Sequence, residues 1–333
     1  MQANTYAGPG KSLFSWVAIL LSVLLFLAGC GNNSAGGAEE AEAELAAEEE
    51  TAREVTHAMG TTTIEGTPEK IVTLYQGATD AAVEMGVKPV GAVESWLQQP
   101  YYEYLSADME GVPVVGEETQ PNLEEIAKLE PDLIIASQIR HEEIYEQLSQ
   151  IAPTVVHETV YDFKGTVEMM GEAMNQQEKA DELISAWDDR VADFQSKIQE
   201  KVGDRWPMHV TVANFREDHA RIYVTGFAGS ILTELGFEGP KNMTDESLEI
   251  VKLTDKESIP QMNADVIYAF MEDTDAVKKT YGEWTSHPLW TNLDAVKADQ
   301  VYTVDEIIWN MGGGIRAANL MLDDIYDRFE LEK

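Results

Sequence analysis

The pattern of apolar and polar positions divides the chain around one long amphipathic segment, residues 176–202. Its apolar residues recur at steps of three and four, as they do in a helix with one buried face: Ala180, Leu183, Ile184, Trp187, Val191, Phe194 and Ile198. No Gly or Pro interrupts the segment before Gly203. About 27 residues at about 1.5 Å each give a helix of about 40 Å, which is long enough to cross a domain.

Segments on both sides of this helix alternate between strand and helix patterns. A hairpin around Met59-Gly60 opens the folded region near Val55. Strands are predicted at 71–74, 89–93, 132–136 and 154–156, with helices at 79–85, 123–129, 142–151 and 163–174. After the long helix, strands are predicted at 208–213, 221–224, 265–269 and 301–304, with helices at 229–235 and 315–329. This alternation predicts an α/β fold with mainly parallel sheets.

A weak internal repeat supports two related lobes. Residues 124–136 and 257–269 share Glu, Ile, Leu or Met, Asp, Ile and Ala at identical offsets. The alternative is that any two helix-to-strand units would match in part. We predict two Rossmann-like α/β lobes linked by the single long helix.

The first thirty residues have the features of a secretory leader. Lys11 precedes an apolar run of about 15 residues that ends in Leu27-Ala28-Gly29-Cys30. A charged start, a short apolar run and small residues at its end favour a signal peptide over a membrane-spanning helix. Leu-Ala-Gly-Cys resembles the lipobox of bacterial lipoproteins, in which the Cys becomes the lipidated first residue. We therefore predict a signal peptide at 1–29, lipidation at Cys30, and a solvated acidic tether to residue 54.

The charge and the cysteine count exclude several classes of function. The formal net charge is −37, from 60 acidic and 23 basic residues, which argues against binding to nucleic acid or to anionic membranes by charge. We interpret the acidity as adaptation of the surface to a salty or alkaline exterior. Cys30 is the only cysteine, so neither a disulfide framework nor a catalytic thiol is expected.

A set of motifs in fixed order resembles one family. The motifs are the lipobox, the acidic tether, KIVTLYQGATDAAVEMGVKPVG, NLEEIAKLEPDLIIAS, IAPTVV, QEKADEL, RIYVTGFAGSILTELGF and NMGGGIRAANLMLDDI. Together they resemble the iron–siderophore substrate-binding lipoproteins of Gram-positive ABC importers, most closely the ferric-citrate type and other carboxylate or hydroxamate siderophore binders.

The resemblance implies the helical-backbone periplasmic-binding-protein fold, with lobes at 55–163 and 204–333 and linking helices at 164–203. It also implies an extracellular receptor, anchored to the cell membrane by lipid, that holds an Fe(III)–siderophore chelate between its lobes. The receptor would deliver the chelate to a permease powered by a cytoplasmic ATPase. We expect a monomer without a cofactor or a protein-bound metal.

Ligands of open α/β sheets lie beyond the carboxyl ends of the strands, which directs attention to the residues there. Arg binds carboxylates through a planar fork that stays charged, so it suits an anionic chelate. The candidates for ligand contact are Arg140, Arg216, Arg221 and Arg316. The first two are better placed, whereas structural ion pairs are the alternative for the last two. Candidate aromatic walls are Trp96, Tyr75, Phe215 and Trp309, and partial burial in the core is the alternative for each.

Glu124 and Glu257 occupy matching places at the starts of the two repeated helices. In the family, one glutamate from each lobe typically pairs with permease arginines, so the resemblance implies a docking role. Favourable interaction with the helix dipole is the alternative, worth about 0.3–1 kcal/mol each. Glu84 and Glu234 are other docking candidates.

Three other functions fit the sequence less well than siderophore capture. A zinc or manganese receptor would present about three His and a carboxylate, but the six His form no spaced pair. A haem or cobalamin receptor on the same scaffold stays an alternative. An extracellular enzyme is disfavoured because the chain has no G-x-S-x-G, no H-E-x-x-H and no free thiol, and Gly312-Gly313-Gly314 lacks the Lys of a phosphate loop.

Overall fold

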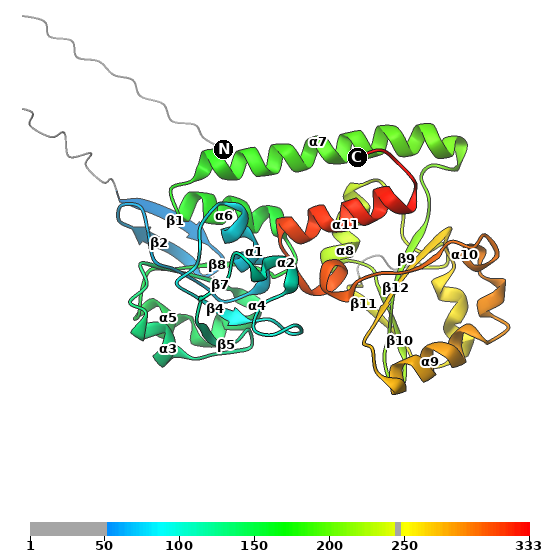
Figure 1. The fold of residues 1–333 in the computed structure, drawn as a ribbon, viewed down its shortest axis with the longest axis horizontal. Coiled ribbons are helices and arrows are strands. Elements are labelled where there is room, and N and C mark those ends of the chain that lie inside the picture. Colours follow the sequence, from blue (N-terminus) through cyan, green and yellow to red (C-terminus); the bar gives the residue numbers. More distant parts are fainter. Residues whose placement is uncertain (1–51, 244–247) are drawn as a thin grey trace, which may run out of the picture. The chain divides into compact units, whose positions relative to one another are not determined.

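The computed structural model describes residues 52–243 and 248–333, which belong to one unit, Glu48–Lys333 (Figure 1). The predicted signal peptide, Cys30 and nearly all of the tether lie outside the described residues. Within the described part of the chain, no helix combines the length and the apolar character needed to cross a bilayer.

The first sheet lies before the long helix and has the strand order β6-β5-β4-β3-β7-β8. All neighbouring strands are parallel except β5 and β6. Its strands are β3 Ile71–Thr73, β4 Gly91–Glu94, β5 Val114–Glu117, β6 Gln120–Pro121, β7 Leu133–Ser137 and β8 Thr154–His157. The central strand β7 is buried throughout, as expected of a parallel strand covered on both faces. The predicted hairpin is present as β1 Arg53–His57 and β2 Gly60–Ile64.

Short helices and loops connect these strands. They are α1 Gln76–Glu84, α2 Glu103–Ser106, α3 Leu123–Lys128, α4 Gln138–His141, η1 Glu142–Ile144, α5 Tyr145–Ser149 and α6 Phe163–Ala173. The start of α3 is fixed by Asn122, whose side chain accepts hydrogen bonds from the backbone N–H groups of Glu124 and Glu125. The element after β8 is α6, which packs on the long helix.

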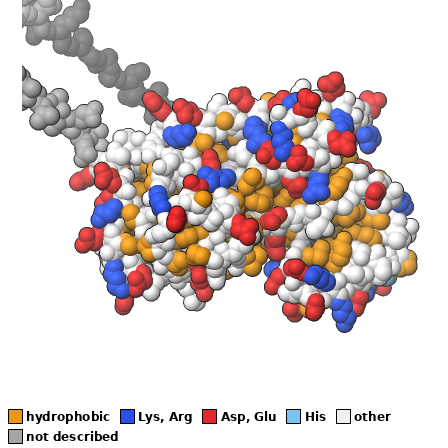
Figure 2. Space-filling view, viewed as in Figure 1, with side chains coloured by type: hydrophobic (Ala, Val, Ile, Leu, Met, Phe, Trp, Pro, Cys, Tyr) orange, Lys and Arg blue, Asp and Glu red, His pale blue; other side chains and the backbone are white. Residues whose placement is uncertain are grey.

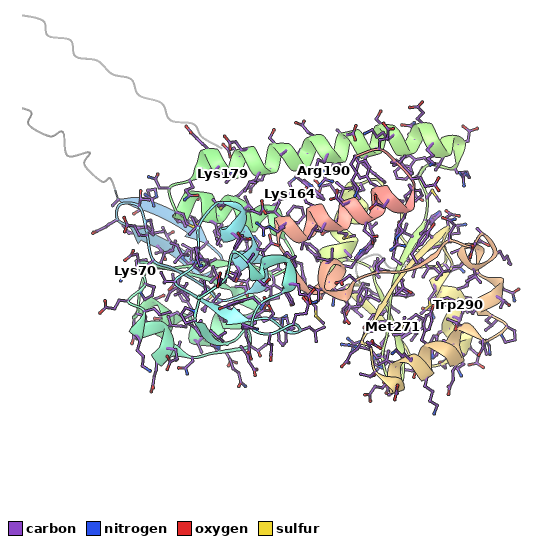
Figure 3. All side chains as sticks on the ribbon, in the orientation of Figure 1. Lys70, Lys164, Lys179, Arg190, Met271 and Trp290 are labelled. Atoms are coloured by element: carbon purple, nitrogen blue, oxygen red, sulfur yellow. The ribbon has the colours of Figure 1, made fainter. Side chains whose placement is uncertain are left out.

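The long helix α7, Gln177–Val202, confirms the prediction (Figure 1). Its buried stripe packs on α6 and on the last helix, α11 Ile315–Arg328. The Trp187 ring meets Phe163 of α6 edge-on at 5.0 Å, and the Phe194 ring meets Tyr326 of α11 at 5.4 Å. Arg190, labelled in Figure 3, adds an ion pair with Asp323 of α11. The helix is therefore attached to elements from before and after it in the chain.

The second sheet follows α7 and has the order β11-β10-β9-β12-β13. Its strands are β9 Val210–Phe215, β10 Ala220–Tyr223, β11 Ile250–Leu253, β12 Val266–Met271 and β13 Val301–Thr303. The expectation of mainly parallel pairing holds less well here, because β10 is antiparallel to both β9 and β11. The physical reason is the tight turn after β9, in which the Arg216 N–H donates to the His219 carbonyl, since only antiparallel strands can be joined so closely.

The helices of this half are η2 Gly203–Arg205, α8 Gly226–Glu234, η3 Lys256–Met262, α9 Asp275–Thr285, η4 Trp290–Asn292, α10 Asp294–Lys297, the π-helix η5 Ile307–Met311, and α11. The pattern of apolar residues predicts α8 and α11, whereas α9 and the edge strand β11 were not predicted.

Besides the long helix, a set of hydrogen bonds joins α1 to the start of α11, and we call this contact the joint. The buried Asp80 carboxylate accepts hydrogen bonds from the backbone N–H groups of Arg316 at 2.7 Å and Ala317 at 3.0 Å. A Cβ on Gly314 would lie 2.2 Å from the Asp80 Cγ, so the approach requires glycine. The joint ties the first half of the chain to its last helix without a covalent link.

Acidic side chains are spread over the face shown in Figure 2, with Lys and Arg among them. Among the described acids, only Asp80, Glu118 and Glu306 are buried. The strongly negative charge of the described part is therefore carried at the surface, and each buried carboxylate requires its own explanation.

Candidate functional site

A cavity of about 220 Å³ is lined by residues from before and after α7. The first half contributes Gln76, Gly77, Trp96, Glu118, Arg140, Val160 and Tyr161. The second half contributes Tyr223, Ile250, Asn310, Met311 and Gly313. A neighbouring cavity of about 630 Å³ shares Tyr161 and extends past Ile139 and Lys164 to Ser230 and Glu249. We call these two cavities together the cleft.

The topology explains why the first half contributes these residues. Gln76 follows β3, Trp96 follows β4, Arg140 follows β7 and Tyr161 follows β8. These four strands are parallel, so their carboxyl ends meet at one edge of the sheet, where the loops offer side chains to a ligand. In the second half, by contrast, Tyr223 reaches the cleft from β10 and Ile250 from the edge strand β11.

Arg140 is held by a buried carboxylate. Its Nε donates to Oε1 of Glu118 at 3.0 Å, and the Glu118 side chain is only 3% exposed. Oε2 of Glu118 accepts from the backbone N–H of Gln76 at 3.2 Å. Burial raises the pKa of Glu118, while Arg140 and the Gln76 N–H oppose that rise. The pairing occupies one edge of the guanidinium and leaves its terminal nitrogens for a ligand.

The Glu118 loop is itself tied to α4 by His141. Nδ1 of His141 accepts from the backbone N–H of Ser137, and Nε2 donates to the Glu118 carbonyl at 2.8 Å. Burial lowers the pKa of His141 to about 4, so the ring stays neutral and keeps this tautomer. Arg140 and its partner are thus positioned by the same short helix.

Arg216 also faces a buried carboxylate. Nη1 of Arg216 lies 3.9 Å from Oε1 of Glu306, whose side chain is 8% exposed. That oxygen has no hydrogen-bond partner among the described residues. Burial raises the pKa of Glu306, and the charge of Arg216 opposes the rise. Arg216 does not line the cavity, although it belongs to the turn between β9 and β10.

Arg221 lies on β10, two residues from Tyr223. Its Nε donates to Nε2 of His219 at 3.0 Å, and Nδ1 of His219 bonds to Asp218 at 2.5 Å. Because Nε2 accepts, the proton of the ring is on Nδ1. This chain of bonds fixes the guanidinium without placing a carboxylate against it.

Two of the predicted aromatic residues, Tyr75 and Trp309, lie outside the cleft. Tyr75 is fully buried, and its hydroxyl is 3.1 Å from that of Thr166. Trp309 is 1% exposed, lies 4.4 Å from the Tyr268 ring and donates its Nε1 to Asp324. Both side chains belong to the main hydrophobic core, and we leave them out of the proposed site.

Arg316 is engaged at the joint between α1 and α11. It forms ion pairs with Glu84 and with Asp108, the latter at 2.7 Å, besides the backbone bond to Asp80. These contacts fit the alternative of a structural ion pair, and we leave Arg316 out of the proposed site as well. Phe215 is likewise buried, against Tyr281 and Trp290.

Exposed apolar side chains gather at the cleft. Trp96, Ile139 and Ile250 are 44%, 48% and 38% exposed, and each lines one of the two cavities. Large exposed apolar groups usually mark binding surfaces when they cluster. The cleft therefore offers apolar walls beside Arg140.

The two docking candidates are both exposed and lie in the first turns of their helices. Asn122 caps α3, which carries Glu124, and Asp255 caps η3, which carries Glu257. The two helices differ, since η3 is a 3-10 helix that contains Pro260. Of the other candidates, Glu84 pairs with Arg316 and Glu234 pairs with Lys164.

Another cavity, of about 600 Å³, lies near the amino ends of β12 and β13. Its Lys201, Arg205 and Arg328 face Asp265, Asp294 and Glu330. These opposite charges balance, and the position is the edge of the sheet that ligands of such folds avoid. Over residues 52–243 and 248–333, no three His, Cys, Asp or Glu side chains are grouped to hold a metal.

Sequence reasoning missed Glu118, Tyr161 and Tyr223. Tyr161 could have been found, because it follows the predicted strand at 154–156. Tyr223 lines the cavity because alternate residues of β10 point to opposite faces of the sheet. The sequence alone does not show which of the two faces lies toward the cleft. Glu118 carried no signal, since it is one acid among 60 in a turn between short strands.

Comparison with known proteins decides the family. The family model described as periplasmic binding protein matches residues 71–308. The chain belongs to the periplasmic binding protein family. The members of this family are substrate-binding receptors, and the α/β fold with its long helix is confirmed.

Among the relatives, the achromobactin-binding periplasmic protein of Dickeya dadantii is 45% identical over 78% of this chain and 85% of its own length. The probable siderophore-binding lipoprotein YfiY of Bacillus subtilis is 40% identical over 96% of this chain and 98% of its own. The crystal structure of Staphylococcus aureus SirA complexed with staphyloferrin B superposes with a TM-score of 0.81. It is 51% identical and covers 84% of this chain and 99% of SirA.

Proposed function

We propose that this protein captures a ferric siderophore in the cleft and delivers it to an ABC importer. The observation that carries the proposal is the 51% identity to SirA over nearly all of that chain, whose structure holds staphyloferrin B. The cleft supports it with Arg140 and the exposed Trp96 side by side in one cavity. The ligand is an Fe(III) chelate that already satisfies its iron, of the citrate-like or hydroxamate type, so the protein supplies no metal ligands.

Binding needs no bond to be made or broken. Arg140 donates to a carboxylate of the chelate, and Trp96, Tyr161 and Tyr223 pack on its apolar faces. Arg216 and Arg221, which line neither cavity in this structure, would reach the ligand from the second half of the chain. We therefore propose a receptor without enzymatic activity.

The anchoring of the receptor follows from the leader. Residues 1–29 act as a signal peptide, Cys30 carries lipid, and the acidic segment to residue 54 is a tether. The folded part then acts as a monomer outside the membrane, with lobes at 55–163 and 204–333 joined through residues 164–203. The lipoprotein name of the Bacillus relative supports this arrangement.

The test is a tryptophan fluorescence titration of residues 52–333 without the leader. The titrants are ferric citrate, a ferric trihydroxamate, a ferric catecholate, haem, cobalamin and Zn²⁺. We expect saturable quenching by a ferric chelate, because Trp96 lines the cavity. The Trp96→Phe variant is the control that assigns the signal to this side chain. Quenching by haem, cobalamin or Zn²⁺ alone would contradict the proposal.

A further inference from the structure

The joint between α1 and α11 reaches the wall of the cleft. Gly77 of α1 and Gly313, two residues before α11, both line the smaller cavity. A Cβ on Gly77 would lie 2.6 Å from the carbonyl oxygen of Gly313, so the two backbones are in close contact. Asp80 follows Gly77 by three residues, about one turn of α1. The two halves of the chain therefore meet at the cleft and, one turn further along α1, at a buried carboxylate.

The Asp80 carboxylate has three hydrogen-bond partners. Its Oδ1 accepts from the N–H of Arg316, and its Oδ2 accepts from the N–H of Ala317 and from the hydroxyl of Tyr104 in α2. The two N–H groups can only donate, whereas the hydroxyl can also accept. A proton on Oδ2 can therefore be donated to the Tyr104 oxygen. The neutral carboxyl keeps all three partners in this way and buries no charge.

The described charged groups around Asp80 do not neutralise it. Glu84 lies one turn further along α1, and the guanidinium of Arg316 is directed to Glu84 and Asp108. The buried face of α6, which also packs on α1, carries no charged residue. Burial raises the pKa of Asp80, the hydrogen bonds oppose the rise, and the charge of Glu84 adds to it. A buried carboxyl group without a cation of its own is most stable in the neutral form.

From this arrangement we propose that the joint is a latch operated by a proton, meaning a contact that opens without unfolding of the whole protein. With Asp80 neutral, the start of α11 stays fixed to α1. With Asp80 ionised, water solvates the carboxylate only when the start of α11 moves away, so the joint opens more readily. Because Gly77 and Gly313 belong to the same contact, opening separates the two halves at the cleft. The coupling to a bound chelate rests on the proposed receptor function, whereas the latch itself does not.

Hydrogen exchange of residues 52–333 without ligand measures the opening, because the amides of Arg316 and Ala317 exchange only after they leave Asp80. After correction for the intrinsic pH dependence of exchange, their protection should fall about tenfold per pH unit between pH 5 and pH 7. In Asp80→Asn the protection should not depend on pH. The matched control is Asp108→Asn, which removes an exposed carboxylate of the same joint and should keep the slope of the wild type.

A second variant tests the latch if Asp80→Asn does not fold. Tyr104→Phe keeps the carboxyl group and removes the hydroxyl that bonds to it. The protection of both amides should fall at pH 5 and at pH 7, while the slope is kept. Unchanged protection in Tyr104→Phe would overturn the latch, because the proton would then have no acceptor in the joint.

Two results for the wild type would also overturn the latch. One is protection of the Arg316 and Ala317 amides that does not depend on pH. The other is protection equal at every pH to that of the buried residues Phe194 and Ile198 in α7. Equal protection would show that the joint opens only when the whole protein unfolds.

A bound chelate tests the coupling to the cleft. Ferric citrate and a ferric trihydroxamate are added at pH 7, each at a concentration that saturates the fluorescence signal. The chelate that binds should raise the protection of the Arg316 and Ala317 amides by about tenfold or more. A chelate that quenches fluorescence without changing this protection would overturn the coupling. No binding of either chelate would contradict the receptor function and leave the latch to the measurements without ligand.

Discussion

Arg140 and Arg216 each face a buried glutamate, and the distance between the charged groups differs in the two pairs. Glu118 bonds to Arg140 at 3.0 Å, whereas Glu306 lies 3.9 Å from Arg216 without a hydrogen bond at its nearer oxygen. A buried carboxylate behind an arginine fixes the guanidinium, but it also cancels part of the charge offered to an anion. Orientation is thus gained at some cost in attraction for the ligand.

Replacing Arg140 by Ala should weaken a ferric polycarboxylate by about 2 kcal/mol, or about 30-fold, because a charged hydrogen bond is lost. Glu118 would also be left buried and unpaired, which adds repulsion. The double variant Arg140→Ala/Glu118→Gln should therefore bind better than Arg140→Ala alone. Fluorescence titration measures both, with Arg205→Ala as an exposed control. Unchanged affinity in Arg140→Ala would remove this residue from the site.

A substitution at Trp309 tests whether this residue belongs to the hydrophobic core or to the ligand site. It is 1% exposed against Tyr268, so Trp309→Ala should lower the free energy of unfolding by about 3–5 kcal/mol through the cavity it leaves. Ligand affinity under conditions where the variant stays folded should fall less than threefold. Denaturant unfolding and titration of the same preparation give the two values. Normal stability with lost binding would return Trp309 to the site.

Among the elements, α1 and α11 form the joint that the sequence did not reveal. The Asp80 carboxylate of α1 accepts hydrogen bonds from two N–H groups in the first turn of α11, which have no partner within that helix. A residue close in sequence normally fills this capping role. Tyr104 adds a hydrogen bond from its hydroxyl at 3.1 Å. The first turn of α11 is in this way completed only when the two halves of the chain come together.

Burial raises the pKa of Asp80 to about 7, against the opposing effect of these hydrogen bonds. Between about pH 4 and pH 7 the folded state therefore keeps a proton that the unfolded state has lost. The contribution of Asp80 to stability is greatest below pH 4 and is lost as the pH rises to about 7. Relative to Asp80→Asn, the wild type should lose up to a few kcal/mol between pH 5 and pH 8, measured by denaturant unfolding. Parallel pH profiles of the two proteins would contradict this.

For the molecule as a whole, the exposed glutamates of the two halves are the proposed contacts with the permease. The double variant Glu124→Ala/Glu257→Ala should keep its ligand affinity, because both residues lie outside the cleft. Uptake of the ferric chelate by cells should fall at least tenfold. Glu125→Ala/Glu283→Ala, which also removes one exposed acid from each half, is the control. Normal uptake by the first double variant would defeat the docking assignment.

The sequence by itself determined the α/β class, the long helix and most of the strands that surround it. Apolar periodicity reports burial of one face or of both, and that is a local property of a segment. Apolar periodicity also predicted where β4 and β7 end. Trp96 and Arg140 follow those ends, and both line the cavity. The strands β5 and β11 were not predicted because each has only one buried residue and so carries no continuous apolar run.

Only the tertiary structure decided which polar residues meet. Glu118 reaches Arg140 across 22 positions, and Asp80 reaches Arg316 across 236. Pairing at such separations depends on how the sheets and helices pack, which no local pattern encodes. The same holds for the burial that withdrew Tyr75 and Trp309 from the cleft.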